Sequence, residues 1–174
     1  AREISSIIKK NIKSEYNYKN STHNIDFDSD KLTVVIDSDD VRRYCLAKID
    51  NLIVTKSPFW LKNFLAKFGI SSVNNLVDAT NYFMITTGQP LHAFDYNLID
   101  KSKIFISDKV DSEIETLSNV LCKTKGSLSI SDGIGPIAVA GVIGGKRTSI
   151  SHETKCILLE LSLIHISEPT RRDP

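Results

Sequence analysis

Residues 57–88 read SPFWLKNFLAKFGISSVNNLVDATNYFMITTG. The pair Ser57-Pro58 is typical of a helix start, a cap followed by proline at the first position, and apolar residues then recur at helical spacing up to Gly69. A second apolar stripe runs from about Ser72 to Thr87 and stops at Gly88. The stretch therefore predicts two helices, each ended by a glycine.

β-rich sequence surrounds these helices on both sides. Upstream, residues 31–37 and 43–54 are rich in β-branched side chains and predict two strands separated by Ser38-Asp39-Asp40. Downstream, short apolar segments separated by Gly, Asp and Ser turns predict strands at 104–107, 128–131, 137–140 and 156–159. Two helices within a β-rich chain indicate an α+β fold.

We expect the two ends of the chain to lie outside this domain. Helical spacing of apolar residues predicts a short amphipathic helix at 1–13, and the polar run 14–30 is typical of a linker, which places the domain at 31–160. Residues 161–171 resemble the translation of a sequencing adapter, so we expect 161–174 to be a non-native tail. With neither an initiator Met nor a signal-peptide pattern, the chain is expected to be a fragment of a longer protein.

Composition excludes several classes of protein. Of the 174 residues, 41% are apolar and 25% charged, without the long apolar run of a membrane span or the polarity of a disordered chain. A net charge of +1 argues against a strongly basic nucleic-acid binder. Three cysteines without a C-x-x-C pair argue against a disulfide framework or a zinc ribbon and favour a cytoplasmic protein.

Polar residues gather at 77–82 and 88–95, which read VDATNY and GQPLHAFD. Their Asn, Gln, His and Asp side chains offer both donors and acceptors, and Pro90 fixes how His92 is presented, so a polar pocket could form. Judged by these residues alone, a histidine between two apolar neighbours is more often a satisfied structural residue than a functional one.

Two further stretches leave alternatives open. The glycines of 137–145 match neither nucleotide-binding spacing, so they form either a tight turn or a close approach to a ligand. Glu160 follows an apolar strand and is either its solvent end or a buried acceptor matched by a ligand donor. No Ser-His-Asp order, zinc-ligand spacing or pair of catalytic carboxylates stands out in the sequence.

Seven motifs, in order and spacing, resemble the B3/B4 domain of the phenylalanyl-tRNA synthetase beta subunit, and the resemblance covers residues 1–160. They are R-Y at 43–44, S-P-x-W-L at 57–61, G-I at 69–70, V-D-x-T-N-Y at 77–82, G-Q-P-L-H-A-F-D at 88–95, A-G-V-I-G-G at 140–145 and T-x-x-x-L-L-E at 154–160.

This resemblance implies a fold and a set of partners. The family enzyme joins two alpha and two beta subunits and attaches phenylalanine to tRNA(Phe) using ATP and Mg²⁺, and its B3/B4 domain hydrolyses mischarged tyrosyl-tRNA(Phe). The resemblance therefore implies a mixed α/β domain containing a β-sandwich, contact with the 3′ end of the tRNA and an alpha subunit, no cofactor in this segment, and no membrane or DNA partner.

The resemblance also assigns roles to residues. Those that line the editing cleft are Thr80, Asn81 and His92, those that give it a close backbone wall are Ala140, Gly141 and Gly144, and the one that meets the tyrosine hydroxyl is Glu160. We expect His92 to act first as a positioning group and second as a general base. Ser71 stands in a substrate-binding position where the family usually has an arginine.

Physical chemistry supports a second, editing site, because a pocket shaped for phenylalanine cannot strongly reject a ligand that only adds a hydroxyl. Two alternatives stay open. The first is a non-catalytic tRNA-positioning module with a degenerate editing site, for which Ser71 is the main argument, and the second is a freestanding trans-editing protein. The family site also uses a Thr-x-Ala motif beyond the glutamate, in the segment that the expected tail replaces.

Overall fold

The computed structural model describes residue 9 and residues 32–100 and 103–164. The chain divides into Ala1–Asp30 and Lys31–Pro174, and all of the helices and strands described below belong to the second unit. Apart from Lys9, the expected helix at 1–13 and linker at 14–30 lie outside the described residues, as does the expected tail from residue 165 onward.

The larger sheet has five strands in the order β1-β4-β7-β8-β9. These are β1 (Thr33–Asp37), β4 (Lys103–Ser107), β7 (Ser129–Ser131), β8 (Pro136–Val139) and β9 (Ile143–Gly144). β1 pairs parallel to β4, and the other neighbours are antiparallel. β5 (Glu113–Glu115) and β6 (Leu121–Lys123) form a separate antiparallel pair.

The smaller sheet carries the candidate site residues His92 and Glu160. Its antiparallel strands have the order β2-β10-β3, and they are β2 (Val41–Ile49), β10 (Ile157–Ile164) and β3 (His92–Asp95). In the observed register Glu160 lies opposite Leu46 on one side and opposite His92 on the other. Because directly opposed residues point to the same face, all three side chains share one face of this sheet.

Side chains from both sheets form one hydrophobic core. On β4 the residues alternate, so that Ile104 and Ile106 are buried while Lys103 and Phe105 are exposed. Phe94 and Leu158 enter the same cluster from the smaller sheet. The core thus lies between two sheets, which confirms the predicted α+β fold with a β-sandwich.

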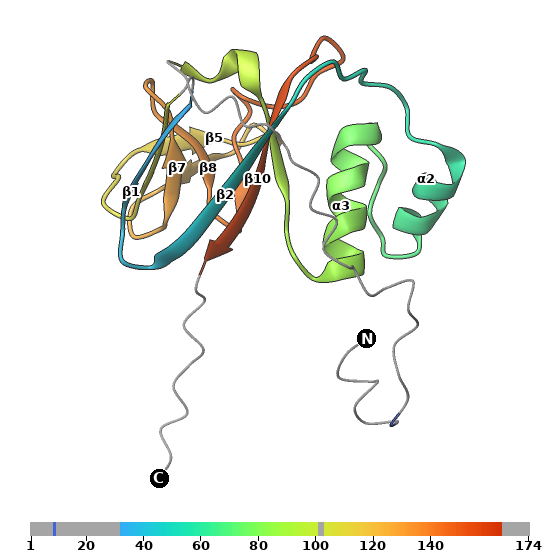
Figure 1. The fold of residues 1–174 in the computed structure, drawn as a ribbon, viewed down its shortest axis with the longest axis horizontal. Coiled ribbons are helices and arrows are strands. Elements are labelled where there is room, and N and C mark those ends of the chain that lie inside the picture. Colours follow the sequence, from blue (N-terminus) through green and yellow to red (C-terminus); the bar gives the residue numbers. More distant parts are fainter. Residues whose placement is uncertain (1–8, 10–31, 101–102, 165–174) are drawn as a thin grey trace. The chain divides into compact units, whose positions relative to one another are not determined.

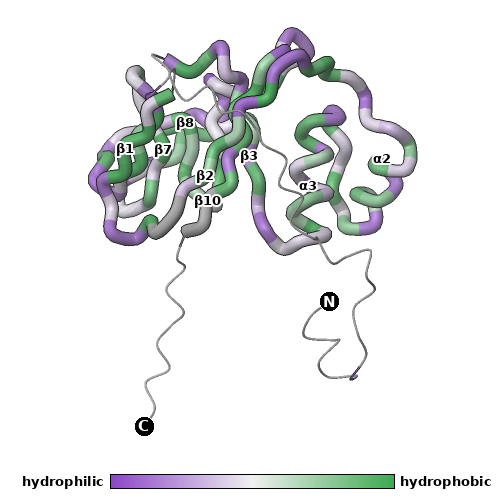
Figure 2. The backbone as a smooth tube through the Cα atoms, viewed as in Figure 1, coloured by the Kyte–Doolittle hydropathy of each residue, from purple (hydrophilic) through white to green (hydrophobic). Residues whose placement is uncertain are grey.

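The two predicted helices are α2 (Phe59–Ala66) and α3 (Asn75–Thr87), which pack against each other, and α3 also contacts β3. Figure 1 shows them on the side of β2 and β10 away from the larger sheet. Hydrophobic residues occur in both helices as well as in the strands (Figure 2). α3 ends at Gly88 as predicted, with a left-handed φ of 78°.

The starts of both helices differ from the prediction. Pro58 is the N-cap of α2 and no side chain caps it, because the hydroxyl of Ser57 donates instead to the buried carboxylate of Asp78. α3 begins three residues later than expected, where Asn74 caps it by accepting from the backbone N–H groups of Leu76 and Val77.

The strands also differ in length from the prediction. The strand expected at 43–54 ends at Ile49, and after it Asn51 adopts a left-handed φ of 58°, which breaks extended geometry. The strand expected at 156–159 continues to Ile164, paired with the start of β2. The sequence prediction missed β3, in which His92 is the first residue.

Candidate functional site

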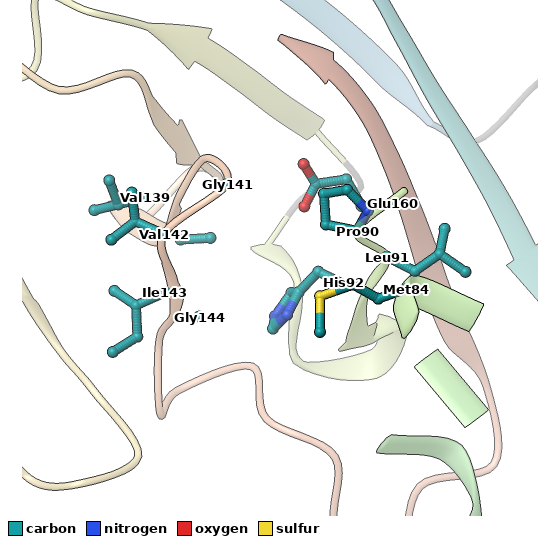
Figure 3. A pocket seen from close by; sticks show the side chains of 11 residues that line it. Met84, Pro90, Leu91, His92, Val139, Gly141, Val142, Ile143, Gly144 and Glu160 are labelled. Atoms are coloured by element: carbon teal, nitrogen blue, oxygen red, sulfur yellow. The ribbon is translucent and has the colours of Figure 1, made fainter. Parts of the chain in front are cut away.

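A pocket of about 190 Å³ lies between the larger sheet and the strand β3. Figure 3 shows Val139, Val142 and Ile143 on one side, and Pro90, His92 and Glu160 on the other. The residues that line it are Met84, Pro90, Leu91, His92, Ala138, Val139, Gly141, Val142, Ile143, Gly144 and Glu160. His92 and Glu160 are the only ionisable side chains in this lining, and the other side chains that line the pocket are apolar.

The turn after α3 brings His92 into the pocket. The N–H of Gly88 donates to the carbonyl of Met84, which closes the last turn of the helix. Gly88 then reverses the chain, and Pro90 restricts the backbone before β3 begins at His92. A helix stop followed by a proline thus fixes where the imidazole emerges.

The imidazole of His92 is held between two neighbours. It packs edge-to-face against Phe94, with ring centroids 4.5 Å apart and an interplanar angle of 71°. Gly144 lies on it from the larger sheet, because a Cβ at that position would be 2.3 Å from Cε1 of His92. Burial lowers the pKa of His92 from 6.5 to about 4, so the ring is neutral at physiological pH.

Glu160 is the second polar group of the pocket, and it is only 5% exposed. It follows the fully buried Leu158 on the core-facing side of β10, so the alternative of a solvent-exposed strand end is wrong. An ionised carboxylate offers about four acceptor positions, and burial among apolar side chains strengthens each hydrogen bond that it accepts.

Glycines shape the opposite wall. Gly141 turns the chain after β8 with a left-handed φ of 69°, which glycine adopts without strain. Gly144 makes room for His92. Gly145 is needed for a different reason, since a Cβ there would lie 2.8 Å from the carbonyl oxygen of Ile137. These glycines therefore serve a turn and two close approaches.

Of the site residues expected from sequence, His92, Gly141, Gly144 and Glu160 come together in this pocket, and the others do not line it. Ala140 precedes Gly141 and packs against the core. On α3, the hydroxyl of Thr80 donates to the carbonyl of Val77 at 2.8 Å, and Asn81 is half-buried. Ser71 is exposed in the segment between the helices.

The apolar lining of the pocket was not foreseen. Pro90 and Leu91 adjoin His92 in sequence, and Met84 lies four residues before the Gly88 helix stop, so proximity to the motif was a usable signal for these three. Val142 and Ile143 sit within the predicted glycine turn but carried no signal of their own. Only the pairing of β8 with β9 places them at the pocket.

Within residues 32–100 and 103–164, no group of three or more His, Cys, Asp or Glu side chains is placed to hold a metal ion. No helix there is long and apolar enough to span a membrane. Cys45, Cys122 and Cys156 are free thiols in the structure.

Comparison with known proteins adds a family to this geometry. Residues 40–171 match the family model of the B3/4 domain. The chain is 38% identical over 146 residues to the phenylalanine–tRNA ligase beta subunit of Oceanobacillus iheyensis, covering 80% of this chain and 18% of that subunit. It is 34% identical over 169 residues to that of Streptococcus agalactiae, covering 95% of this chain and 21% of that subunit.

A third relative, the beta subunit of Protochlamydia amoebophila, is 46% identical over 120 residues, or 68% of this chain and 15% of that subunit. Among solved structures, an N-terminal fragment of the phenylalanyl-tRNA synthetase beta subunit from Pyrococcus horikoshii shares the fold, with a TM-score of 0.54 and 12% identity over 75% of this chain and 43% of that one. The chain thus spans about a fifth of the length of its bacterial relatives.

Proposed function

Because the chain belongs to the B3/4 domain family, we propose that it hydrolyses the ester of mischarged tyrosyl-tRNA(Phe). The observation that carries this proposal is the pairing of Glu160 with His92 across β10 and β3, which aims a carboxylate and a neutral imidazole into one pocket whose other side chains are apolar. A tyrosyl side chain fits such a pocket, because its ring is apolar and it carries a single polar group at its tip.

Glu160 would select tyrosine over phenylalanine. The phenol O–H donates a charge-assisted hydrogen bond to the buried carboxylate, whereas a phenyl ring brings no donor and displaces whatever solvent the carboxylate had. A buried hydrogen bond to a charged group contributes about 1.5–3 kcal/mol, which corresponds to a preference of roughly 10- to 100-fold. The pocket would thus favour the amino acid that a synthetic site cannot exclude.

His92 would position the attacking water. Its neutral ring has one nitrogen that accepts a hydrogen bond, and the low pKa makes it a weak base, so orientation of the water is its main contribution. The water oxygen forms a bond to the ester carbonyl carbon, and the bond from that carbon to the ribose oxygen breaks. One water proton ends on the ribose oxygen, which leaves tyrosine and an intact tRNA 3′ end.

We also propose that this activity belongs to a larger enzyme. The relatives are beta subunits of phenylalanine–tRNA ligase, so the partners would be the 3′ end of tRNA(Phe) and an alpha subunit, in the cytoplasm. ATP and Mg²⁺ would serve amino-acid activation elsewhere in that enzyme.

The test is deacylation of tyrosyl-tRNA(Phe) by the full chain, with phenylalanyl-tRNA(Phe) as the control substrate. We expect tyrosyl-selective hydrolysis that falls at least tenfold in His92→Ala, while Glu160→Gln loses selectivity more than rate. His152→Ala and Glu153→Gln are matched controls, because both side chains are more than four-fifths exposed. Hydrolysis that is equal for the two substrates, or unchanged in both site variants, would refute the proposal.

Two observations favour a second candidate, a tRNA-positioning module without catalysis. Ser71 is an exposed neutral residue at a position where the family usually supplies a cation, and Thr80 and Asn81 do not line the pocket. This candidate predicts that the chain binds tRNA(Phe) but leaves the tyrosyl ester intact. The same deacylation assay, combined with a tRNA binding measurement, therefore separates the two functions.

A further inference from the structure

The phenol oxygen of Tyr44 is a buried polar atom without a hydrogen-bond partner among the described residues. Tyr44 lies on β2, and its ring packs against the core cluster between the two sheets. A buried hydroxyl that makes no hydrogen bond destabilises the fold, because it loses its contacts with water and gains none in return. Such an atom in a native structure calls for an explanation.

The register of the smaller sheet places Tyr44 next to Glu160. Glu160 lies opposite Leu46, and Tyr44 is two residues before Leu46, so Tyr44 is a diagonal neighbour of Glu160 on the same face. Diagonal neighbours in an antiparallel pair lie within reach of a long aromatic side chain. The strand that carries Glu160 is therefore flanked by Tyr44 on β2 and by His92 on β3.

The Tyr44 phenol is a neutral hydrogen-bond donor beside the Glu160 carboxylate. Burial and then the nearby Glu160 carboxylate both raise the pKa of the Tyr44 phenol, which keeps its proton at any working pH. The only hydrogen-bond role that fits a protonated phenol beside a carboxylate is donation to it. Tyr44 packs against the core cluster and is not part of the pocket lining, so its hydroxyl would approach the carboxylate from the core side rather than from the pocket.

We propose that Tyr44 is a positioning residue for tyrosine selection, and that its hydroxyl donates a hydrogen bond to the Glu160 carboxylate once a hydroxylated ligand occupies the pocket. This inference rests on the proposed function. The ligand phenol donates to one carboxylate oxygen from the pocket, and Tyr44 donates to the carboxylate from the core side. A carboxylate with both donors in place is fixed in one orientation, which strengthens its preference for a ligand that carries a hydroxyl.

The experiment measures binding of two stable amide analogues of the aminoacylated tRNA end, 3′-(L-tyrosylamino)-3′-deoxyadenosine and its phenylalanyl counterpart, to the full chain. The quantity of interest is the ratio of the phenylalanyl to the tyrosyl dissociation constant. Tyr44→Phe removes only the hydroxyl, and we expect it to lower this ratio by about tenfold through weaker tyrosyl binding, with the phenylalanyl constant nearly unchanged.

Two comparisons separate positioning from a general effect on structure. Tyr96→Phe is the matched control, since Tyr96 packs against the same core cluster but lies beside Lys48, with the ammonium 4.9 Å from its ring centroid. It should leave the ratio unchanged. In a Glu160→Gln background, Tyr44→Phe should have little further effect on the ratio, because the two residues act on the ligand hydroxyl as a unit.

The outcomes are distinct. If the unaltered chain prefers the tyrosyl analogue and Tyr44→Phe preserves the ratio, the role of Tyr44 is refuted while the proposed function stands. If the unaltered chain shows no preference, tyrosine selection itself fails, and the inference fails with it. An equal loss of affinity for both analogues would indicate a change in packing and would also refute the positioning role.

A measurement on the unaltered sequence covers the case in which Tyr44→Phe does not fold. The chain is labelled with ¹³C at the Cζ atoms of its tyrosines, whose chemical shifts report hydrogen bonding of the phenol. We expect one protein signal to move on addition of the tyrosyl analogue but not of the phenylalanyl one, and this response should disappear in Glu160→Gln. A set of signals that responds identically to both analogues would overturn the inference.

Discussion

The imidazole of His92 occupies the space that any side chain at position 144 would need. A Cβ on Gly144 would lie 2.3 Å from Cε1 and 2.6 Å from Nε2 of His92. Space, rather than backbone conformation, requires this glycine, since Gly144 is not among the glycines with positive φ. The larger sheet thus sets the position of a ring that belongs to the smaller sheet.

Gly144→Ala should therefore displace the His92 ring and impair hydrolysis without unfolding the domain. The clash is with the far end of a side chain beside a pocket of about 190 Å³, into which the ring can move. We expect the rate of tyrosyl-tRNA(Phe) hydrolysis to fall by roughly 100-fold, since misplacement by about 1 Å has effects of that order. The assay is deacylation, combined with thermal unfolding.

Alanine substitutions at two other glycines serve as controls for this prediction. Gly135→Ala meets no atom within 4 Å and should change neither rate nor stability. Gly145→Ala meets the carbonyl of Ile137 at 2.8 Å, so it should lower stability instead. A Gly144→Ala variant with full activity would show that the ring position does not limit hydrolysis.

Local sequence patterns predicted much of the fold but not the site. The helix stop at Gly88 and the strand predicted at 104–107 rest on local signals, and the structure confirms both. The opposition of His92 and Glu160 depends on the pairing of strands that lie far apart in the chain, and nothing in either strand specifies that register. Residue patterns marked His92 and Glu160 as candidates with alternatives left open, and only the family resemblance assigned them roles in one site.

The Ser57-Pro58 pair shows why a correct pattern can still assign a wrong contact. The sequence favoured Ser57 as a helix cap, yet its hydroxyl donates to Asp78 on the next helix. Asp78 is fully buried and its carboxylate accepts several hydrogen bonds, and tertiary contacts of this kind leave no trace in helical periodicity.

Replacement of Asp78 should destabilise the domain at the place where the segments that precede the two helices meet α3. Its carboxylate accepts from the hydroxyls of Ser57 and Ser72 and from the backbone N–H of Val73. Asp78→Ala leaves these donors unpaired in a buried place, and we expect the free energy of unfolding to fall by about 3 kcal/mol. Asp78→Asn keeps the shape and should cost less. Urea denaturation at pH 7 measures both.

The Asp78 carboxylate should also make the stability of the domain depend on pH in the acid range. Burial alone would raise the pKa of Asp78, but the hydrogen bonds from Ser57, Ser72 and Val73 outweigh it and lower the pKa below 3.8. Its contribution is therefore present above pH 3.8 and lost as the pH falls below that value. Asp111→Ala, which removes one exposed partner of Lys125, is the control and should change stability by less than about 0.5 kcal/mol.

Arg147 and Asp132 form a bidentate pair that should be sensitive to the shape of the cation. Two guanidinium nitrogens of Arg147 lie 2.6 and 2.9 Å from the two carboxylate oxygens of Asp132, whose side chain is fully buried. Arg147→Ala leaves that carboxylate with backbone donors alone, and we expect a loss of about 3 kcal/mol. Arg147→Lys keeps the charge without the fork and should lose roughly half of this.

Chemical denaturation of the two variants tests this order. Lys109→Ala is a suitable control, because Lys109 pairs with Asp37 at 2.7 Å in a site where both side chains are mostly exposed. It should change stability very little. If Arg147→Lys were as stable as the unaltered chain, a positive charge alone would be enough to stabilise the buried Asp132 carboxylate, and the bidentate geometry would be incidental.

Titration of His92 should make the domain less stable in mild acid. Burial holds its pKa at about 4 in the folded state, against 6.5 for the free side chain. Below pH 6.5 the unfolded chain binds a proton that the folded chain rejects, so this part of the stability is complete above pH 6.5 and is lost as the pH falls toward 4. A shift of this size corresponds to about 3 kcal/mol.

The measurement is the free energy of unfolding at several pH values between 7 and 4.5, for the unaltered chain and for His92→Phe. Carboxylates titrate alike in both, so the difference between the two curves isolates the histidine. We expect the free energy of unfolding of the unaltered chain to fall relative to that of His92→Phe as the pH falls, because only the unaltered chain loses this contribution. His152→Phe, at an exposed histidine, should run parallel to the unaltered chain. Parallel curves for His92→Phe as well would mean that folding does not lower the pKa of His92, and the argument from a low pKa against general-base catalysis by this ring would then fail.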